Sequence, residues 1–148
     1  MSETPVVDIL MFHSISDVDS PISIKPSVFE AQIEAVARSG IPVVTMDDLV
    51  AARSGGAPLP DRSIVITFDD AFQDFADVAQ PILKRHGFSS IVYLPTDLLG
   101  REERCVGTYT TPRQIMGWDV IRSLAEDGVQ FGSHSVTHSD LTALTDDT

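Results

Sequence analysis

A repeated order of helix, glycine and strand is the feature that most constrains the fold of this chain. It occurs at 39–41 (S-G-I), 86–88 (H-G-F) and 127–129 (D-G-V), each time between an amphipathic segment and an apolar run. Glycine in the left-handed conformation ends a helix at little cost and lets the chain turn back. Strands that alternate with helices in this way pair in parallel through right-handed crossovers. The pattern predicts an α/β fold, either a doubly wound open sheet or a (β/α) barrel.

The expected elements follow from apolar periodicity and from helix start and stop signals. Strands are expected at residues 6–11, 43–44, 64–68, 90–94 and 129–132. Helices are expected at 26–39, 45–53, 75–86 and 118–127, with a long loop at 95–112 and the start of a further helix at 141–148. A closed barrel needs about eight strands and roughly 250 residues. With about five strands in 148 residues, we expect an incomplete barrel within a single domain.

Charge and composition exclude several classes of partner. The formal net charge of −12 opposes binding to nucleic acid or to anionic membranes and favours a neutral or cationic partner. No apolar stretch reaches the ~18 residues of a membrane span, and the N-terminus lacks the pattern of a signal peptide. As written, the chain would be cytoplasmic, although a parent protein in the cell envelope or outside the cell stays open. A lone cysteine, Cys105, rules out an intrachain disulfide framework.

Two adjacent carboxylates, Asp69 and Asp70, follow the most apolar of the expected strands. At a strand end the chain can turn and aim both side chains into one pocket. Carboxylates held close together repel each other unless a cation lies between them. A divalent metal would let one Asp act as a ligand while the other stays free as a base. The alternative is an acidic pair that caps the next helix.

Two histidines, His134 and His138, follow the last expected strand. If this segment forms a helical turn, their side chains share a face with Cβ atoms ~5–6 Å apart and can bind one zinc-type metal. The alternative is a pair of exposed loop histidines. One carboxylate and two imidazoles together form a three-ligand set with open positions for water and substrate. Both sets lie at the carboxyl ends of strands, where α/β folds place their active sites.

These motifs also resemble those of a known family. The segment 67–70 (T-F-D-D) resembles the first metal motif of the NodB-type polysaccharide deacetylases, carbohydrate esterase family 4. The segment 134–138 (H-S-V-T-H) is similar to the H-[ST]-x-T-H form of that family's second motif. The segments 9–13, 93–96 and 118–132 resemble the flanking parts of the family, so the resemblance covers nearly the whole chain.

The resemblance implies a fold, an activity and a role for each residue. Asp69 would be the general base, and Asp70, His134 and His138 would hold one divalent metal, usually zinc. The fold would be a distorted (β/α)7 barrel, of which residues 1–148 would be the N-terminal portion. The activity would be metal-dependent removal of acetyl groups, mostly N-acetyl, from a polysaccharide or amino sugar. From its place at the end of the first strand, near the expected mouth of the site, His13 is predicted to line the substrate groove. The alternative is that His13 only binds a backbone carbonyl.

Two departures from the family pattern affect the interpretation. Ala71 stands where the family usually has glycine, an exchange that a positive φ would strain. The family's later motifs, which carry the general acid, have no counterpart here, so no general acid is assigned. A truncated, non-catalytic metal- or sugar-binding module is therefore the alternative. A magnesium-dependent phosphoryl-transfer domain is disfavoured, because Mg²⁺ prefers oxygen ligands to imidazole. The open edge of an incomplete barrel predicts that the chain self-associates or that another element covers the edge. The sequence does not identify the sugar.

Overall fold

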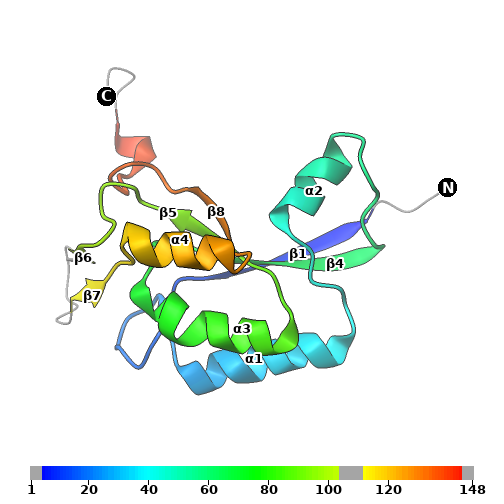
Figure 1. The fold of residues 1–148 in the computed structure, drawn as a ribbon, viewed down its shortest axis with the longest axis horizontal. Coiled ribbons are helices and arrows are strands. Elements are labelled where there is room, and N and C mark those ends of the chain that lie inside the picture. The colour runs from blue at the N-terminus through cyan, green and yellow to red at the C-terminus, as the bar shows by residue number, and fades with distance from the viewer. Residues whose placement is uncertain (1–4, 104–111, 145–148) are drawn as a thin grey trace.

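The computed structural model describes residues 5–103 and 112–144. Its centre is a parallel sheet of four strands in the order β1-β4-β5-β8 (Figure 1). These strands are β1 (Val6–Phe12), β4 (Arg62–Phe68), β5 (Ile91–Leu94) and β8 (Gln130–Ser133). Helices connect successive strands, and every pairing in this sheet is parallel. The α/β class predicted from the helix–glycine–strand pattern is confirmed.

Three helices pack on one side of the sheet and share a single core with it (Figure 1). They are α1 (Pro26–Ser39), α3 (Gln80–His86) and α4 (Trp118–Glu126). The core joins their apolar faces to the strands through Phe29, Ile33, Leu83, Ile121, Leu124, Ile66, Phe68 and Val92. A fourth helix, α2 (Met46–Arg53), has no buried residue and stands apart from the others. The core therefore stabilises one layer of helices against the sheet.

Shorter elements surround the carboxyl ends of the strands. β2 (Ser14–Ile15) pairs in parallel with β3 (Ser23–Ile24), and β6 (Glu102–Glu103) pairs antiparallel with β7 (Arg113–Gln114). β6 lies within the loop expected at 95–112, so part of that loop is paired. Cys105 lies outside the described residues. Of the further helix expected at 141–148, the structure describes a 3-10 turn at Leu141–Ala143. Residues 145–148 lie outside the description.

The strand expected at 43–44 is not formed. Val43 forms an isolated parallel bridge with Ile64 in place of the expected strand. Thr45 ends this pairing, because its side chain accepts the backbone N–H of Asp48 and the Asp48 carboxylate accepts the N–H of Thr45. This capping box starts α2 at once. The described sheet therefore has four strands, fewer than a closed barrel needs.

The helix expected at 75–86 begins with an unusual turn. A π-helix, η1 (Phe75–Ala79), precedes α3, and Pro81 lies in the first turn of α3 as predicted. Proline has no N–H to donate into the preceding turn, and its ring crowds the carbonyl four residues before it. The N–H of Gln80 donates to the carbonyl of Phe75, five residues earlier. This longer spacing gives the wider π-helical turn.

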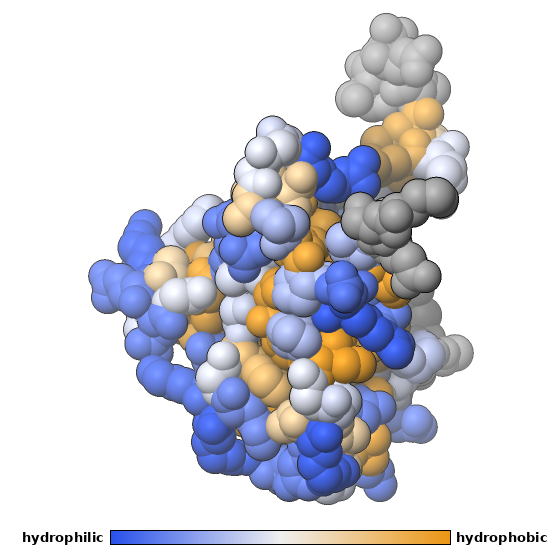
Figure 2. All heavy atoms as spheres, turned by 90° about the vertical axis from the view of Figure 1, so that its right-hand side faces the viewer, coloured by the Kyte–Doolittle hydropathy of each residue, from blue (hydrophilic) through white to orange (hydrophobic). Residues whose placement is uncertain are grey.

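β1 forms one edge of the described sheet. It carries large apolar side chains into solvent, with Val6, Ile9 and Met11 exposed by 54%, 55% and 60%. Figure 2 shows apolar side chains reaching the surface at the right-hand end of Figure 1, among polar ones. Such an edge supports the expectation of self-association, which stays a prediction. Among the helices that the structure describes, none is both long and apolar enough to cross a bilayer.

Candidate metal centre

Asp69 and Asp70 lie where β4 ends and the chain turns. The N–H of Asp69 donates to the carbonyl of Phe12 at 2.9 Å, which extends the pairing with β1 by one step. Asp70 then adopts a left-handed backbone with a φ of 69°. This turn directs its side chain inward, so that the side chain is 7% exposed. The buried Oδ1 atom of Asp70 accepts no hydrogen bond from the described residues.

His134 and His138 lie on a loop that follows β8. The N–H of His134 donates to the carbonyl of Leu94, which continues the pairing with β5. The N–H groups of Thr96 and Asp97 then bind carbonyls of the loop, at Ser135 and Val136. The segment does not form the helical turn that was considered for it, because Ser135 and His138 have left-handed φ angles of 63° and 55°. The loop brings the imidazoles together through this turn and through its anchor on the chain after β5.

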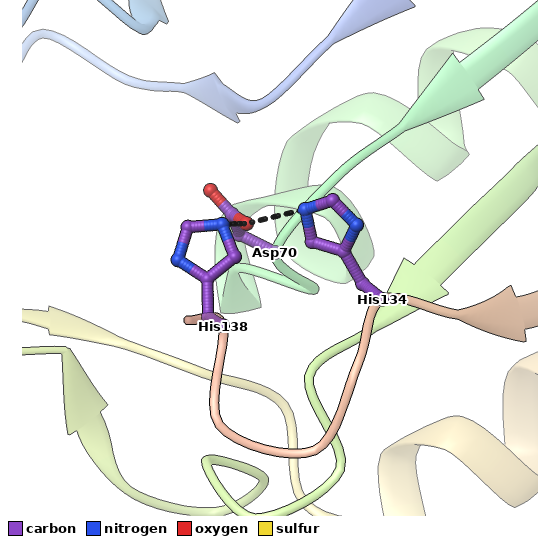
Figure 3. Close-up of side chains that lie close together, drawn as sticks. All are labelled: Asp70, His134 and His138. Atoms are coloured by element: carbon purple, nitrogen blue, oxygen red, sulfur yellow. Dashed lines mark ion pairs between the residues drawn. The ribbon is translucent and has the colours of Figure 1, made fainter. Parts of the chain in front are cut away.

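The three predicted ligands converge on one point (Figure 3). The Oδ1 atom of Asp70 lies 3.4 Å from Nε2 of His134 and 3.1 Å from Nε2 of His138. One ligand atom from each residue lies within 4.8 Å of the others. Tetrahedral zinc with bonds of about 2.0–2.1 Å separates two ligand atoms by roughly 3.3 Å. Both carboxylate–imidazole distances match that edge, so the site has the dimensions of a three-ligand metal centre.

The electrostatics of Asp70 favour a bound cation. Burial raises the pKa of Asp70 above its ordinary value, and positive charge on His138, His13 or His134 opposes that rise. A buried carboxylate without a hydrogen-bond donor on Oδ1 is costly in its charged form. A metal ion would supply the missing positive charge. The orphaned oxygen and the two nearby imidazoles therefore fit the group that the sequence predicted.

His13 lies beside Asp69. Its Nε2 atom is 3.8 Å from Oδ2 of Asp69, and the two side chains are 23% and 15% exposed. His86, in contrast, lies in the last turn of α3 and stacks on Phe88 with ring centroids 5.6 Å apart. Of these two histidines, His13 is thus the one that joins the predicted site residues.

Backbone strain in the described chain gathers at this centre. The non-glycine residues with positive φ are Asp70, Ala71, Ser135 and His138. Left-handed backbone costs an L-residue roughly 1–2 kcal/mol and persists where the surroundings enforce it, often at functional sites. All four residues belong to the two turns that present the predicted ligands. The strain therefore supports a functional role for these turns.

Ala71 provides a test of this strain. Its φ is 56°, so the alanine that replaces the family's usual glycine is strained. We expect Ala71→Gly to leave the free energy of unfolding unchanged or to raise it by up to about 1 kcal/mol, because relief of strain offsets the lost methyl group. Ala79→Gly is the matched control: Ala79 is equally buried but right-handed, with a φ of −67°. It should cost roughly 1–2 kcal/mol in urea denaturation. Equal losses in both variants would contradict the strain.

Gly132, two residues before His134 in β8, packs closely against the ring of Tyr93. A Cβ atom at this position would lie 2.6 Å from Cε1 of Tyr93, too close for any real contact. We expect Gly132→Ala to displace β8 or the ring, to move His134, and to weaken Zn²⁺ binding by roughly 10–100-fold, as loss of a supporting group does. Gly117→Ala is the control, since its nearest contact would be 3.9 Å away. Competition titration with a chelator measures the Zn²⁺ affinity of both variants. Equal affinities would show that the close packing at Gly132 does not position His134.

One residue of this region escaped the sequence analysis. Asp74 lies four residues after Asp70, and its carboxylate binds the segment that follows His13. A third acid in the run D-D-A-F-Q-D was the available signal. The spacing alone did not show which segment the carboxylate would meet, because that depends on how the strands pair.

Comparison with known proteins agrees with this geometry. Residues 56–148 match a sequence family described as polysaccharide deacetylase. YxkH of Bacillus subtilis (strain 168), a protein assigned to the polysaccharide deacetylases, is 26% identical over 137 residues, which are 93% of this chain and 45% of YxkH. The poly-beta-1,6-N-acetyl-D-glucosamine N-deacetylase of Escherichia coli (strain K12) is 30% identical over 135 residues, covering 85% of this chain and 20% of that enzyme.

A solved structure shares the fold. The structure of IcaB from Ammonifex degensii superposes with a TM-score of 0.76 at 21% identity, over 95% of this chain and 56% of IcaB. The chain thus spans about half the length of IcaB, 45% of YxkH and a smaller share of the Escherichia coli enzyme. Together with the parallel sheet, this likeness confirms the predicted fold, the (β/α)7 barrel type.

Proposed function

Because this chain belongs to the polysaccharide deacetylase family, we propose that it hydrolyses acetyl groups, chiefly N-acetyl, on a polysaccharide or amino sugar. The observation that carries the proposal is the convergence of Asp70, His134 and His138 within 4.8 Å. We further propose that residues 1–148 form the N-terminal portion of a single deacetylase domain. The shares of YxkH and IcaB that the chain spans support this reading.

The proposed ligands of a divalent metal are Oδ1 of Asp70 and Nε2 of His134 and His138. Zn²⁺ is the proposed ion, because a carboxylate and two imidazoles suit zinc and leave positions open for water and substrate. When bound, the ion supplies Lewis-acid polarisation of the acetyl carbonyl and a lowered pKa for the attacking water. The exposure of the imidazoles, 32% for His134 and 47% for His138, leaves the site open to a polymer chain.

The first proton transfer belongs to a side chain of this chain. Asp69 is the proposed general base, which takes a proton as water attacks the acetyl carbon. The carbon–nitrogen bond then breaks, acetate leaves, and the amine needs a proton. The donor of that proton is not assigned to a residue of this chain, because the general acid of the family belongs to its later motifs. His13 keeps its proposed role in lining the substrate groove, since its Nε2 lies 3.8 Å from Oδ2 of Asp69 and its side chain is partly exposed.

The charge of the chain fits this reaction. Each N-deacetylation turns a neutral acetamide into an amine that is cationic at neutral pH. A net charge of −12 repels neither the neutral substrate nor the cationic product. The name of the Escherichia coli relative supports N-acetylglucosamine polymers as the first substrates to examine.

Metal analysis beside an acetate-release assay tests the proposal. Protein stripped with a chelator and reloaded should take up about one equivalent of Zn²⁺ per chain. An N-acetylglucosamine oligomer should release acetate with the loaded protein and lose that release with the stripped one. Both measurements should be made on this chain and on a longer form that continues the barrel, which we expect to be the more active.

The outcomes separate the alternatives. Metal uptake without acetate release from either form would favour the non-catalytic binding module. Lack of metal uptake by both forms would contradict the deacetylase proposal itself. Acetate release that persists in the stripped protein would refute the role of the metal.

A further inference from the structure

The segment that carries His13 is held on both sides by residues that follow β4. Before His13, the carbonyl of Phe12 accepts the N–H of Asp69 at 2.9 Å. After His13, the hydroxyl of Ser14 donates to Oδ2 of Asp74 at 2.6 Å, and the N–H of Ile15 donates to Oδ1 of Asp74 at 3.0 Å. Ser14 and Ile15 are buried, so these donors have no ready exchange with water. One carboxylate therefore fixes the chain directly after His13.

Asp74 is well placed to hold this segment rigidly. It precedes the π-helix η1, whose end residues Phe75 and Ala79 are buried in the core. Turns of this type are frequent at functional sites. Burial raises the pKa of Asp74, whereas the bonds from Ser14 and Ile15 and the charge of Arg113 lower it. A half-buried carboxylate is retained where it is paired in this way, and bonds to it are stronger than bonds to neutral groups.

We propose that Asp74 is a positioning residue that holds the His13 imidazole against Asp69. The inference rests on the proposed function, in which Asp69 is the base and His13 lines the groove beside it. At 3.8 Å the contact between Nε2 of His13 and Oδ2 of Asp69 is loose enough that a small displacement would break it. Misplacement by about 1 Å can cost a reacting group on the order of 10²-fold in rate. The segment 69–74 thus supplies the base, a metal ligand and the support for the opposing imidazole.

A coupling experiment on the purified chain tests this role without requiring turnover. The Cε1–H signal of His13 is recorded by NMR at one fixed pH, with and without the change Asp69→Asn. In the parent background, Asp69→Asn should shift this signal, because the imidazole faces the carboxylate. In an Asp74→Ala background, most of that shift should be lost. Co²⁺ binding, followed by its visible absorption, should change by less than about 3-fold, since Asp74→Ala leaves the metal ligands in place.

Two further variants separate positioning from charge. Asp74→Asn should keep the shift, because its oxygen can still accept the N–H of Ile15 and its amide can donate to the Ser14 oxygen. Asp77→Ala is the matched control: Asp77 is exposed and belongs to the same π-helix, and its carboxylate accepts a bond from Gln73. It should leave the shift intact. A full shift in Asp74→Ala, or an equal loss in Asp77→Ala, would overturn the assignment.

A milder variant tests the proposal if Asp74→Ala does not yield folded protein. If Asp74→Ala does not fold, Ser14→Ala removes one of the two donors and should give a partial loss of the shift. Unfolding of Ser14→Ala as well would overturn the positioning role, because the pair would then be needed for the fold itself. Since the shift is read without substrate, a chain that releases no acetate could still show the coupling. An inactive enzyme and a wrong assignment of Asp74 therefore give different results.

Discussion

Asp70→Asn is expected to weaken Zn²⁺ binding on the order of 10³-fold. Structural zinc sites in small proteins bind the ion with roughly 10–16 kcal/mol. Taking that range as a guide, one ligand among three contributes about 4 kcal/mol, or about a factor of 10³ in affinity. Asparagine keeps the shape of the side chain and tolerates the left-handed backbone at this position. The loss would therefore report the missing charge, and competition titration against a chelator would measure it.

The same change should make the metal-free protein more stable at neutral pH. Burial raises the pKa of Asp70, so the folded state disfavours its ionised form. For a raised folded-state pKa, the stability contribution is present below the unfolded-state value and is lost as the pH rises through the folded-state value. Asparagine does not ionise and avoids that loss. Denaturation of the metal-free proteins should show Asp70→Asn gaining on the parent as the pH rises from the acid range.

A variant at the surface tests whether the loss of any nearby carboxylate has the same effect as Asp70→Asn. Asp97→Asn removes a carboxylate close to the imidazole loop, but this carboxylate pairs with Arg101 at the surface. Its variant should bind Zn²⁺ like the parent and show no gain in stability, because exposed pairs contribute little. Equal affinity in Asp70→Asn and Asp97→Asn would show that Asp70 is no ligand. A loss of stability in metal-free Asp70→Asn would contradict the cost of the buried charge.

Local signals predicted the elements that they directly control. The helix expected at 26–39 is found at those residues, since Pro26 suits a first helical turn and Gly40 has the left-handed φ of a helix end. Val43 shows the limit of such signals. Its β-branched neighbourhood predicted a strand, but the capping box at Thr45 starts a helix before the pairing with Ile64 can extend. Two local preferences competed there, and apolar character did not show which would prevail.

The convergence of the proposed ligands could be predicted although their local geometry could not. Asp70 and His134 follow strands, and the carboxyl ends of parallel strands meet at one edge, so convergence followed from the fold class. The spacing of His134 and His138 suggested a helical turn, but the same spacing is met by a loop with left-handed residues. Such a loop depends on its anchors at Thr96 and Asp97. Those contacts join distant parts of the chain, which local patterns do not encode.

The contact between His13 and Asp69 depends on strand register. β1 and β4 pair so that Phe12 lies opposite Phe68, which places the next residue of each strand side by side. Register is set by how apolar faces pack, and a shift of one residue would turn every side chain to the other face. The sequence placed His13 near the mouth of the site. Only the register of β1 against β4 places the His13 side chain beside Asp69.

Asp69→Asn is expected to lower kcat by roughly 10²–10⁴-fold, the usual contribution of one positioned acid–base group. Its affinity for Zn²⁺ should stay within a few-fold of the parent, because the carboxylate of Asp69 faces His13 and stands outside the converging set of ligands. Asp69→Asn and Asp70→Asn are thus the same chemical change at adjacent residues, one expected to remove catalysis and the other to remove the metal. Acetate release and metal content should be measured together, in a form of the protein that shows metal-dependent release. Parental activity in Asp69→Asn would show that another group takes the proton. Loss of metal in that variant would show that both carboxylates bind the ion, and the base would then have to be sought elsewhere in the site.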